Sequence, residues 1–251
     1  MRGEDSMSEV EIRHEGKVTI FTINRPDRLN AINKAVAEDL QRGFAEFDAS
    51  DQRVAVLTGA GDRAFTSGAD VNDLPELWRC VPTVGIVTQK PIICAVDGWC
   101  VGGGLVMAAT ADLCVATERA RFSYPEGKLG LTGGIIAALA ARIPHKMAME
   151  LMLLGRVASG QRAYEMGLVN EVAPDGKHLE VAMGMAEEMA GMAPMVLETL
   201  KSMVNDHMLP KSPAEQMALT QATLGAVRDS ADLQEGLAAY REKRKPNFTG
   251  R

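Results

Sequence analysis

The sequence predicts an α/β fold, with an α/β core followed by a helical C-terminal layer. Over the first two thirds of the chain, short apolar runs typical of strands alternate with segments whose apolar residues recur at helical spacing. From Asp175 to Lys245 the pattern is helical throughout, with breaks at Pro194, Pro210 and Pro213. The 251 residues are enough to bury a core, as one large domain or as one domain with an appendage.

The first third of the chain predicts a hairpin, a helix and a buried strand, at residues 10–23, 33–49 and 54–58. Glu15-Gly16 separates two segments of alternating apolar and polar residues, which favours the hairpin. The helix is expected because its apolar residues recur every three or four positions.

The next strand leads into a glycine-rich segment. Residues 92–96 predict a buried strand, Asp97-Gly98 a turn, and residues 102–104, all glycine, the entrance of a buried helix. Glycines there let a ligand approach the backbone closely, and the unpaired N–H groups of a helix start suit an anion, or an oxygen that becomes one. Tight packing of the helix against the sheet would explain the glycines equally well.

The remaining part of the α/β pattern predicts two strands, two helices, a capped helix and a last strand: residues 112–116, 121–125, 135–143, 147–154, 159–167 and 168–172. In the capped helix, Ser159 is the expected N-cap and Gly167 the expected end.

Composition argues against several classes of protein. The net charge of −6 argues against a general nucleic-acid binder, and no apolar run reaches the roughly 18 residues that a membrane span needs. The polar N-terminus lacks a signal-peptide core, and the four cysteines show no metal or redox spacing, so we expect a cytoplasmic protein with reduced thiols. The four histidines are scattered, so we expect no metal site.

Residues 59–64 match the GxGxxA form of the dinucleotide fingerprint, but we discount NAD binding. A helix should follow this motif at once, whereas residues 65–70 continue as a turn. An acidic residue should end a strand about 20 residues later, whereas residues 81–83 are Val-Pro-Thr.

Five motifs stand in order along the chain: residues 24–31, 64–71, 97–104, 124–126 and 242–248. They read NRP…NA, AFTSGADV, DG…GGG, YPE and EKRKPNF. Together they resemble the crotonase, or enoyl-CoA hydratase/isomerase, superfamily, over nearly the whole chain from about Val10. The resemblance implies a crotonase-like spiral of ββα units with a C-terminal helical oligomerisation region that forms homotrimers or dimers of trimers.

The resemblance also implies an acyl-CoA thioester substrate, with coenzyme A as part of the substrate and no separate cofactor. We expect three parts: a disordered tail at residues 1–9, a spiral acyl-CoA-binding core at residues 10–193, and a trimerisation region at residues 194–251.

By the motif match, the backbone N–H groups of Ala69 and Gly103 form an oxyanion hole for the thioester oxygen. Removing a proton alpha to a thioester places charge on that oxygen, and one fixed N–H donor is typically worth roughly 3 kcal/mol of the barrier. An ordinary turn is the alternative interpretation of the small residues before Asp70. The neighbouring residues implied in substrate binding are Ala31, Ser67, Gly68, Asp70, Val71 and Gly102.

Coenzyme A carries phosphates that need cations. Arg25 and Arg28 flank the first loop, and the resemblance places Tyr240 and Lys243 near the CoA nucleotide, often across a subunit boundary. A solvated charge run is the usual alternative interpretation of the basic cluster at residues 243–245, Lys-Arg-Lys.

Glu126 follows Pro125 beyond a strand, with Tyr124 and Leu129 as apolar neighbours, and it matches one of the two glutamates of the family's hydratases. In an apolar pocket its pKa would rise towards neutrality, which suits proton exchange. A surface glutamate in a turn is the alternative. The other hydratase glutamate should stand where this chain has Val106, and valine cannot activate water.

The sequence therefore favours an acyl-CoA enzyme that uses Glu126 as its sole acid/base for proton-shuttle isomerisation. Two alternatives stay open. One is an enoyl-CoA hydratase or a thioester hydrolase with a substitute polar group, such as Asp70 or Cys100. The other is a CoA-binding protein with little catalysis.

Overall fold

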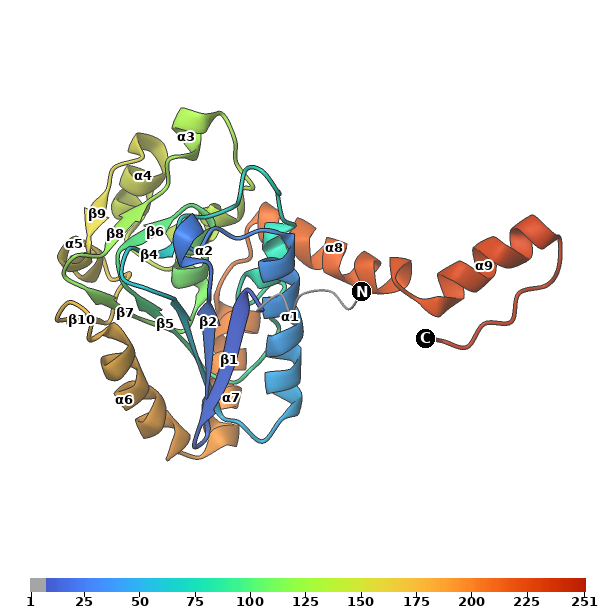
Figure 1. Cartoon of the computed structure of the whole chain (residues 1–251), viewed down its shortest axis with the longest axis horizontal. Coiled ribbons are helices and arrows are strands. Elements are labelled where there is room, and N and C mark those ends of the chain that lie inside the picture. The colour runs from blue at the N-terminus through green and yellow to red at the C-terminus, as the bar shows by residue number, and fades with distance from the viewer. Residues whose placement is uncertain (1–7) are drawn as a thin grey trace, which may run out of the picture.

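The computed structural model describes residues 8–251, and its strands form two sheets (Figure 1). The strands are β1 (Val10–Glu15), β2 (Val18–Ile23), β3 (Val54–Gly59), β4 (Ala64–Thr66), β5 (Ile92–Val96), β6 (Trp99–Val101), β7 (Leu113–Thr117), β8 (Arg121–Ser123), β9 (Ala158–Ser159) and β10 (Glu171–Ala173). A six-stranded sheet has the order β1-β2-β3-β5-β7-β10, and a four-stranded sheet has the order β4-β6-β8-β9. The pairs β1–β2 and β8–β9 are antiparallel and the others are parallel.

The α-helices are α1 (Lys34–Ala49), α2 (Gly103–Thr110), α3 (Glu126–Leu129), α4 (His145–Leu154), α5 (Gly160–Glu165), α6 (His178–Ala190), α7 (Pro194–Ser202), α8 (Pro213–Arg228) and α9 (Ala231–Glu242). Within residues 8–251, three 3₁₀ helices and one π-helix accompany them: η1 (Pro26–Arg28), η2 (Leu77–Cys80), η3 (Ile135–Ala141) and η4 (Met203–Met208).

The chain winds as a spiral of ββα units. In each of the pairs β3–β4, β5–β6 and β7–β8, the first strand enters the large sheet and the second enters the small sheet, and helical structure follows. The predicted α/β spiral with C-terminal helices is therefore confirmed.

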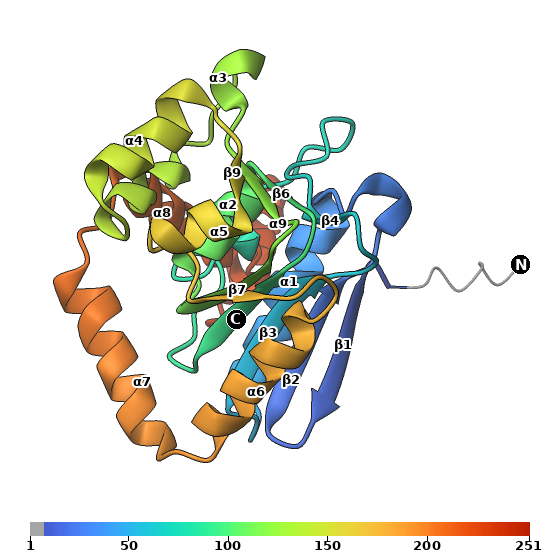
Figure 2. The same cartoon turned by 90° about the vertical axis from the view of Figure 1, so that its left-hand side faces the viewer.

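The central strands β2, β3, β5 and β7 of the large sheet are largely buried, and alternate residues of each strand point to opposite faces. In β2, Phe21 and Ile23 face α1, where the Phe21 ring stacks on Phe44 with centroids 4.0 Å apart. Val18 and Ile20 face the other way and belong to the cluster that α6 covers, as Figure 2 shows. The interior is thus fixed by period-2 patterning within the strands.

Residues 1–7 of the predicted tail lie outside the described residues. Glu9, which we also placed in the tail, is held in the folded body: its carbonyl accepts from Asn24 N at 2.7 Å, and its carboxylate lies 2.9 Å from Arg25 Nε. Glu9 therefore belongs to the core and not to the tail in which we placed it.

Two strand predictions were wrong in detail. We predicted a turn at Asp97-Gly98 and a helix entrance at residues 102–104, with no strand between them, but β6 follows the turn at once, with Cys100 buried within it. The last strand is β10, not residues 168–172; Leu168 and Val169 are buried in the turn after α5 without pairing to a strand. An apolar run predicts burial, and burial does not require a strand.

The C-terminal helices leave the body of the molecule. Figure 1 shows α8 leading outwards and α9 standing apart from the sheets, with the C-terminal segment folded back along α9. That segment is tied to α9, since Asp232 accepts hydrogen bonds from the N–H groups of Thr249 and Gly250. Within residues 8–251, no helix combines the length and apolar character that a membrane crossing requires.

Candidate active site

The segment around Ala69 pairs with Ile32, which fixes the direction of its amides. Ile32 N donates to Gly68 O at 2.8 Å, and Asp70 N donates to Ile32 O at 2.8 Å. Successive N–H groups of an extended segment point to opposite sides, so the N–H of Ala69 points away from Ile32. Within residues 8–251 this N–H has no hydrogen-bond acceptor.

Gly68 brings this segment against the start of α2. Its φ is +91°, and a Cβ at this position would lie 2.9 Å from Val101 O and 3.4 Å from Gly103 N. Only glycine therefore permits both the backbone angle and the approach. Gly103 is the first residue of α2, so its N–H lacks an intrahelical acceptor, and no other acceptor in the described part of the chain reaches it.

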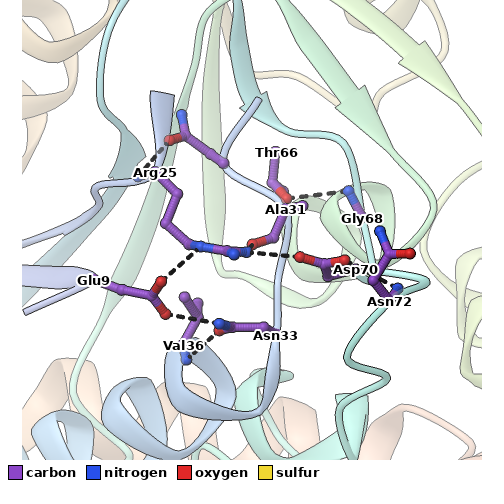
Figure 3. Close-up of polar contacts among 10 residues, drawn as sticks. Glu9, Arg25, Ala31, Asn33, Val36, Thr66, Gly68, Asp70 and Asn72 are labelled. Atoms are coloured by element: carbon purple, nitrogen blue, oxygen red, sulfur yellow. Dashed lines mark hydrogen bonds and ion pairs between the residues drawn. The ribbon is translucent and has the colours of Figure 1, made fainter. Parts of the chain in front are cut away.

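A polar network holds the loop that carries Ala69, as Figure 3 shows. Arg25 is at its centre: Nη1 donates to Ala31 O at 2.5 Å and lies 3.1 Å from Asp70 Oδ2, while Nε lies 2.9 Å from Glu9. The N–H of Asn72 and the Arg25 guanidinium lower the pKa of Asp70. Arg25 is thus neutralised by two carboxylates within the chain, and Asp70 is bound in the network.

Glu126 begins α3 and is half-buried. Its Oε1 lies 2.6 Å from the place that a Cβ on Gly102 would occupy, so the carboxyl group sits directly over the entrance of α2. Gly102 also has φ +55°, which glycine adopts without strain. Oε2 of Glu126 is buried with no hydrogen-bond partner among the described residues, and burial raises the pKa of Glu126 to about 7.

An apolar cavity of about 280 Å³ adjoins Glu126. Its walls come from the turn before η2, from η2, α2, η3 and α8, and it is lined by Pro75, Glu76, Leu77, Trp78, Val106, Tyr124, Glu126, Gly133, Gly134, Ile135, Ile136, Ala214, Met217, Ala218 and Gln221. Val106 is 3% exposed and belongs to this wall. A larger cavity of about 560 Å³, between α7 and the far end of α2, contains none of the predicted site residues.

Two expectations about side chains near Glu126 need correction. Leu129, which we expected as an apolar neighbour, is 67% exposed, and Leu77 and Ile135 help line the cavity instead. Cys100 was a candidate polar substitute, but it is fully buried, a Cβ on Gly104 would lie 3.6 Å from its Sγ, and burial raises its pKa well above the usual range.

The other predicted binding residues are spread more widely. Arg28 is exposed and forms no ion pair with residues 8–251, whereas Ser67 is half-buried and its N–H donates to Leu29 O. Val71 is 71% exposed at the surface. Tyr240 and Lys243 belong to the end of α9, which stands apart from the body, so a single chain does not bring them to Glu126 (Figure 1).

Sequence reasoning missed the wall formed by residues 75–78. Leu77 contacts the helix entrance, since its Cδ1 lies 2.8 Å from a Cβ placed on Gly103. The apolar pair Leu77-Trp78 within a polar stretch was the only signal of this wall in the sequence. Within residues 8–251 there is no group of three or more His, Cys, Asp and Glu side chains that could hold a metal ion.

The family model described as enoyl-CoA hydratase/isomerase matches residues 13–251. The (E)-benzylidenesuccinyl-CoA hydratase of Thauera aromatica is 33% identical over 256 residues, covering 96% of this chain and 99% of that protein. The 2,3-dehydroadipyl-CoA hydratase of Escherichia coli K12 is 32% identical, covering 98% of this chain and 100% of that protein. The solved structure of carnitinyl-CoA hydratase from Mycobacterium avium aligns with a TM-score of 0.77 at 31% identity, over 98% of this chain and 100% of that one. With its spiral of ββα units, this chain belongs to the enoyl-CoA hydratase/isomerase family and is a crotonase-type enzyme.

Proposed function

We propose that this protein acts on an acyl-CoA thioester by proton-shuttle isomerisation, with Glu126 as its sole acid/base and the N–H groups of Ala69 and Gly103 as the oxyanion hole. The observation that carries the proposal is the setting of Glu126. Its carboxyl group has a pKa raised to about 7 and lies over the helix entrance where Gly103 presents its N–H.

The proposed chemistry needs only groups of this chain. The Glu126 carboxylate takes a proton from the carbon alpha or gamma to the thioester carbonyl. Negative charge then moves to the thioester oxygen, where the two N–H donors stabilise it. The carboxylic acid returns its proton to the other carbon as the double bond moves, so no proton is gained or lost overall. A pKa near 7 keeps both protonation states accessible at neutral pH.

Val106 supports a single-carboxylate mechanism. It lines the cavity together with Glu126, and its side chain carries no polar atom. Asp70, the other candidate to replace the second hydratase glutamate, is hydrogen-bonded to Arg25 and to the N–H of Asn72.

Hydration is the second candidate reaction, because relatives at 31–34% identity are named hydratases. Here the Glu126 carboxylic acid would protonate the alpha carbon, and the oxygen of a water held elsewhere in the cavity would bond to the beta carbon. The proton that this water loses would restore the Glu126 carboxylic acid.

The test compares wild type with Glu126→Gln. Wild type is expected to exchange deuterium at the alpha or gamma carbon of a 3-enoyl-CoA, and Glu126→Gln is expected to abolish exchange while CoA-ester binding survives. Fast hydration of a 2-enoyl-CoA that disappears in Glu126→Gln would replace isomerisation with one-carboxylate hydration. Neither reaction, with tight binding intact, would support a CoA-binding protein. Fast turnover by Glu126→Gln would refute the role of Glu126.

A further inference from the structure

The wall of the acyl cavity contains a second carboxylate that the proposed mechanism does not use. Glu76 lines the 280 Å³ cavity together with Glu126. It directly precedes Leu77, the residue whose side chain lies against Gly103. If the thioester oxygen is bound at Gly103, the acyl group extends along the wall that Leu77 and Glu76 share. This inference therefore rests on the proposed function.

Glu76 is held in place by Arg79. Its Oε2 accepts from Arg79 Nε at 2.9 Å and from Nη2 at 2.7 Å, a two-point contact with one carboxylate oxygen. These hydrogen bonds hold the pKa of Glu76 below its usual range, so the group is ionised at neutral pH.

The guanidinium of Arg79 is held outside the cavity. Nη1 donates to Gln41 Oε1 at 2.8 Å, and the guanidinium carbon lies 4.8 Å from the centre of the Trp78 ring, within the range of a cation–π contact. Arg79 contributes to a neighbouring cavity of about 170 Å³, and Glu76 forms part of the wall of both cavities. Glu76 therefore borders both the space that Arg79 lines and the space for the acyl group, whereas Arg79 does not line the latter.

The charges of the cavity wall follow from this arrangement. The described residues that line it include two acidic side chains, Glu76 and Glu126, and no lysine, arginine or histidine. A carboxylate on the acyl group would meet like charge in a partly desolvated space, and none of the described residues that line the cavity supplies a cation to receive it. An uncharged acyl group meets the apolar part of the same wall.

We propose that Glu76 is a specificity-determining residue that favours uncharged acyl groups over acyl groups with a distal carboxylate, by masking the guanidinium of Arg79. Specificity here comes from charge repulsion between Glu76 and the acyl carboxylate, and this repulsion is separate from the contacts that bind the thioester. The Glu76 side chain is 50% exposed, so solvent screens the repulsion, and we expect an effect of about tenfold rather than several thousandfold.

The test measures binding, so it does not depend on turnover. Calorimetric titration of the full chain compares hexanoyl-CoA with adipyl-CoA, which has the same chain length and a terminal carboxylate. Wild type is expected to bind hexanoyl-CoA at least about tenfold more tightly. Glu76→Gln keeps the size of the side chain, removes its charge and leaves Arg79 unmasked, so adipyl-CoA is expected to gain about tenfold or more while hexanoyl-CoA changes little.

Two further variants identify the cause. In the double variant Glu76→Gln with Arg79→Gln, the gain for adipyl-CoA is expected to fall, because the unmasked cation is gone. Glu150→Gln is the matched control: Glu150 also pairs with arginines, Arg156 and Arg162, but it does not line the cavity, so neither affinity should change. Thermal melts compare the fold of every variant with that of wild type.

Equal affinity of wild type for both thioesters, or an unchanged ratio in Glu76→Gln, would overturn this inference and leave the proposed function standing. Failure of wild type to bind either thioester would overturn the proposed function and this inference with it.

Discussion

The α/β core and the C-terminal helices bury their apolar side chains to very different degrees. In the core, Phe21 and Phe44 are at most 1% exposed and stack on each other. In the C-terminal region, Met208 is 75% exposed and Tyr240 85% exposed. The large apolar residues exposed on α7, η4, α8, α9 and the C-terminal segment are Met195, Val196, Leu200, Met203, Val204, Met208, Met217, Leu224, Val227, Leu237, Tyr240 and Phe248.

The apolar side chains of the core are buried within a single chain, whereas those of the C-terminal helices would be buried only by contact with another molecule. Scattered exposed apolar residues are ordinary, but a run of them along successive helices is typical of an interface. We propose that these helices pack against other copies of the chain, in a homotrimer or a dimer of trimers. The predictions below test this contrast, from the largest expected effect to the smallest.

A truncation in the core should cost the most stability. Phe44→Ala is expected to lower the free energy of unfolding by about 3–5 kcal/mol, because it removes a fully buried ring from a packed aromatic cluster. Leu224→Ala, at a 51% exposed position of α8, is the comparison. Chemical denaturation at several protein concentrations should show a loss for Phe44→Ala that does not vary with concentration. The loss for Leu224→Ala should grow with concentration. Equal, concentration-independent losses would contradict the contrast.

The second prediction concerns the amide of Gly103. Gly103→Pro removes the N–H donor and should lower activity at least about a hundredfold. Gly103→Ala is the necessary control, since a Cβ here would meet Leu77 Cδ1 at 2.8 Å. Alanine keeps the N–H, and Leu77 has a flexible side chain that can move. Steady-state kinetics should therefore show a much larger loss for proline than for alanine. Equal losses would mean that steric conflict with Leu77, rather than the donor, explains the effect.

The contrast between the regions also explains what the sequence could predict. Period-2 patterning predicted β2, and the helical spacing of apolar residues predicted α1, because in both cases local pattern and tertiary burial agree. The short strand β6 escaped prediction because three residues show no period. The position of Glu76 was not predicted, because the local sequence does not reveal which acidic side chains line a cavity. A residue's pairing, such as that of Arg25 with Glu9 and Asp70, depends on contacts that no local pattern contains.

The third prediction is the assembly itself. Light scattering at micromolar concentration should give the mass of a trimer or a hexamer. Leu224→Asp should shift the population towards monomer. Each large apolar side chain buried at an interface stabilises the assembly by about 1.5–3 kcal/mol, whereas burying the charged aspartate there would destabilise it. Leu153→Asp is the control, since Leu153 is 72% exposed on α4, outside the C-terminal helices. This substitution should leave the mass unchanged. A stable monomeric wild type would remove the proposal, and with it a cross-subunit role for Lys243.

The fourth prediction follows from the raised pKa of Glu126. If its carboxylate removes the proton, deuterium exchange should rise with pH and level off above about pH 7. The free energy of unfolding should instead fall as pH rises. The folded-state pKa is about 7 and the ordinary value is 4.5, so the folded chain binds the proton more tightly, and stability falls as pH rises through that window. Glu126→Gln cannot ionise, so its stability relative to wild type should improve by about 1–3 kcal/mol between pH 4.5 and pH 8. An unchanged difference between the two proteins would show that burial does not shift this pKa.

The smallest effect is expected at Arg28, where the contrast between satisfied and free groups recurs within one loop. Arg25 is bound to Glu9 and Asp70, whereas Arg28 is exposed and forms no ion pair with residues 8–251. If Arg28 binds a phosphate of coenzyme A, Arg28→Ala should raise the KM for the thioester about two- to fivefold at low salt, with kcat unchanged, and added salt should erase the difference because exposed charges are screened. Arg25→Ala should instead lower kcat and stability together, since it releases the loop that carries Ala69 and leaves two carboxylates unpaired. Kinetics at two ionic strengths, with a melt for each variant, separate the two cases. A KM change for Arg28→Ala that does not depend on salt would contradict phosphate binding by Arg28. A change in KM alone for Arg25→Ala, with kcat and stability intact, would show that Arg25 binds the substrate rather than stabilising the loop.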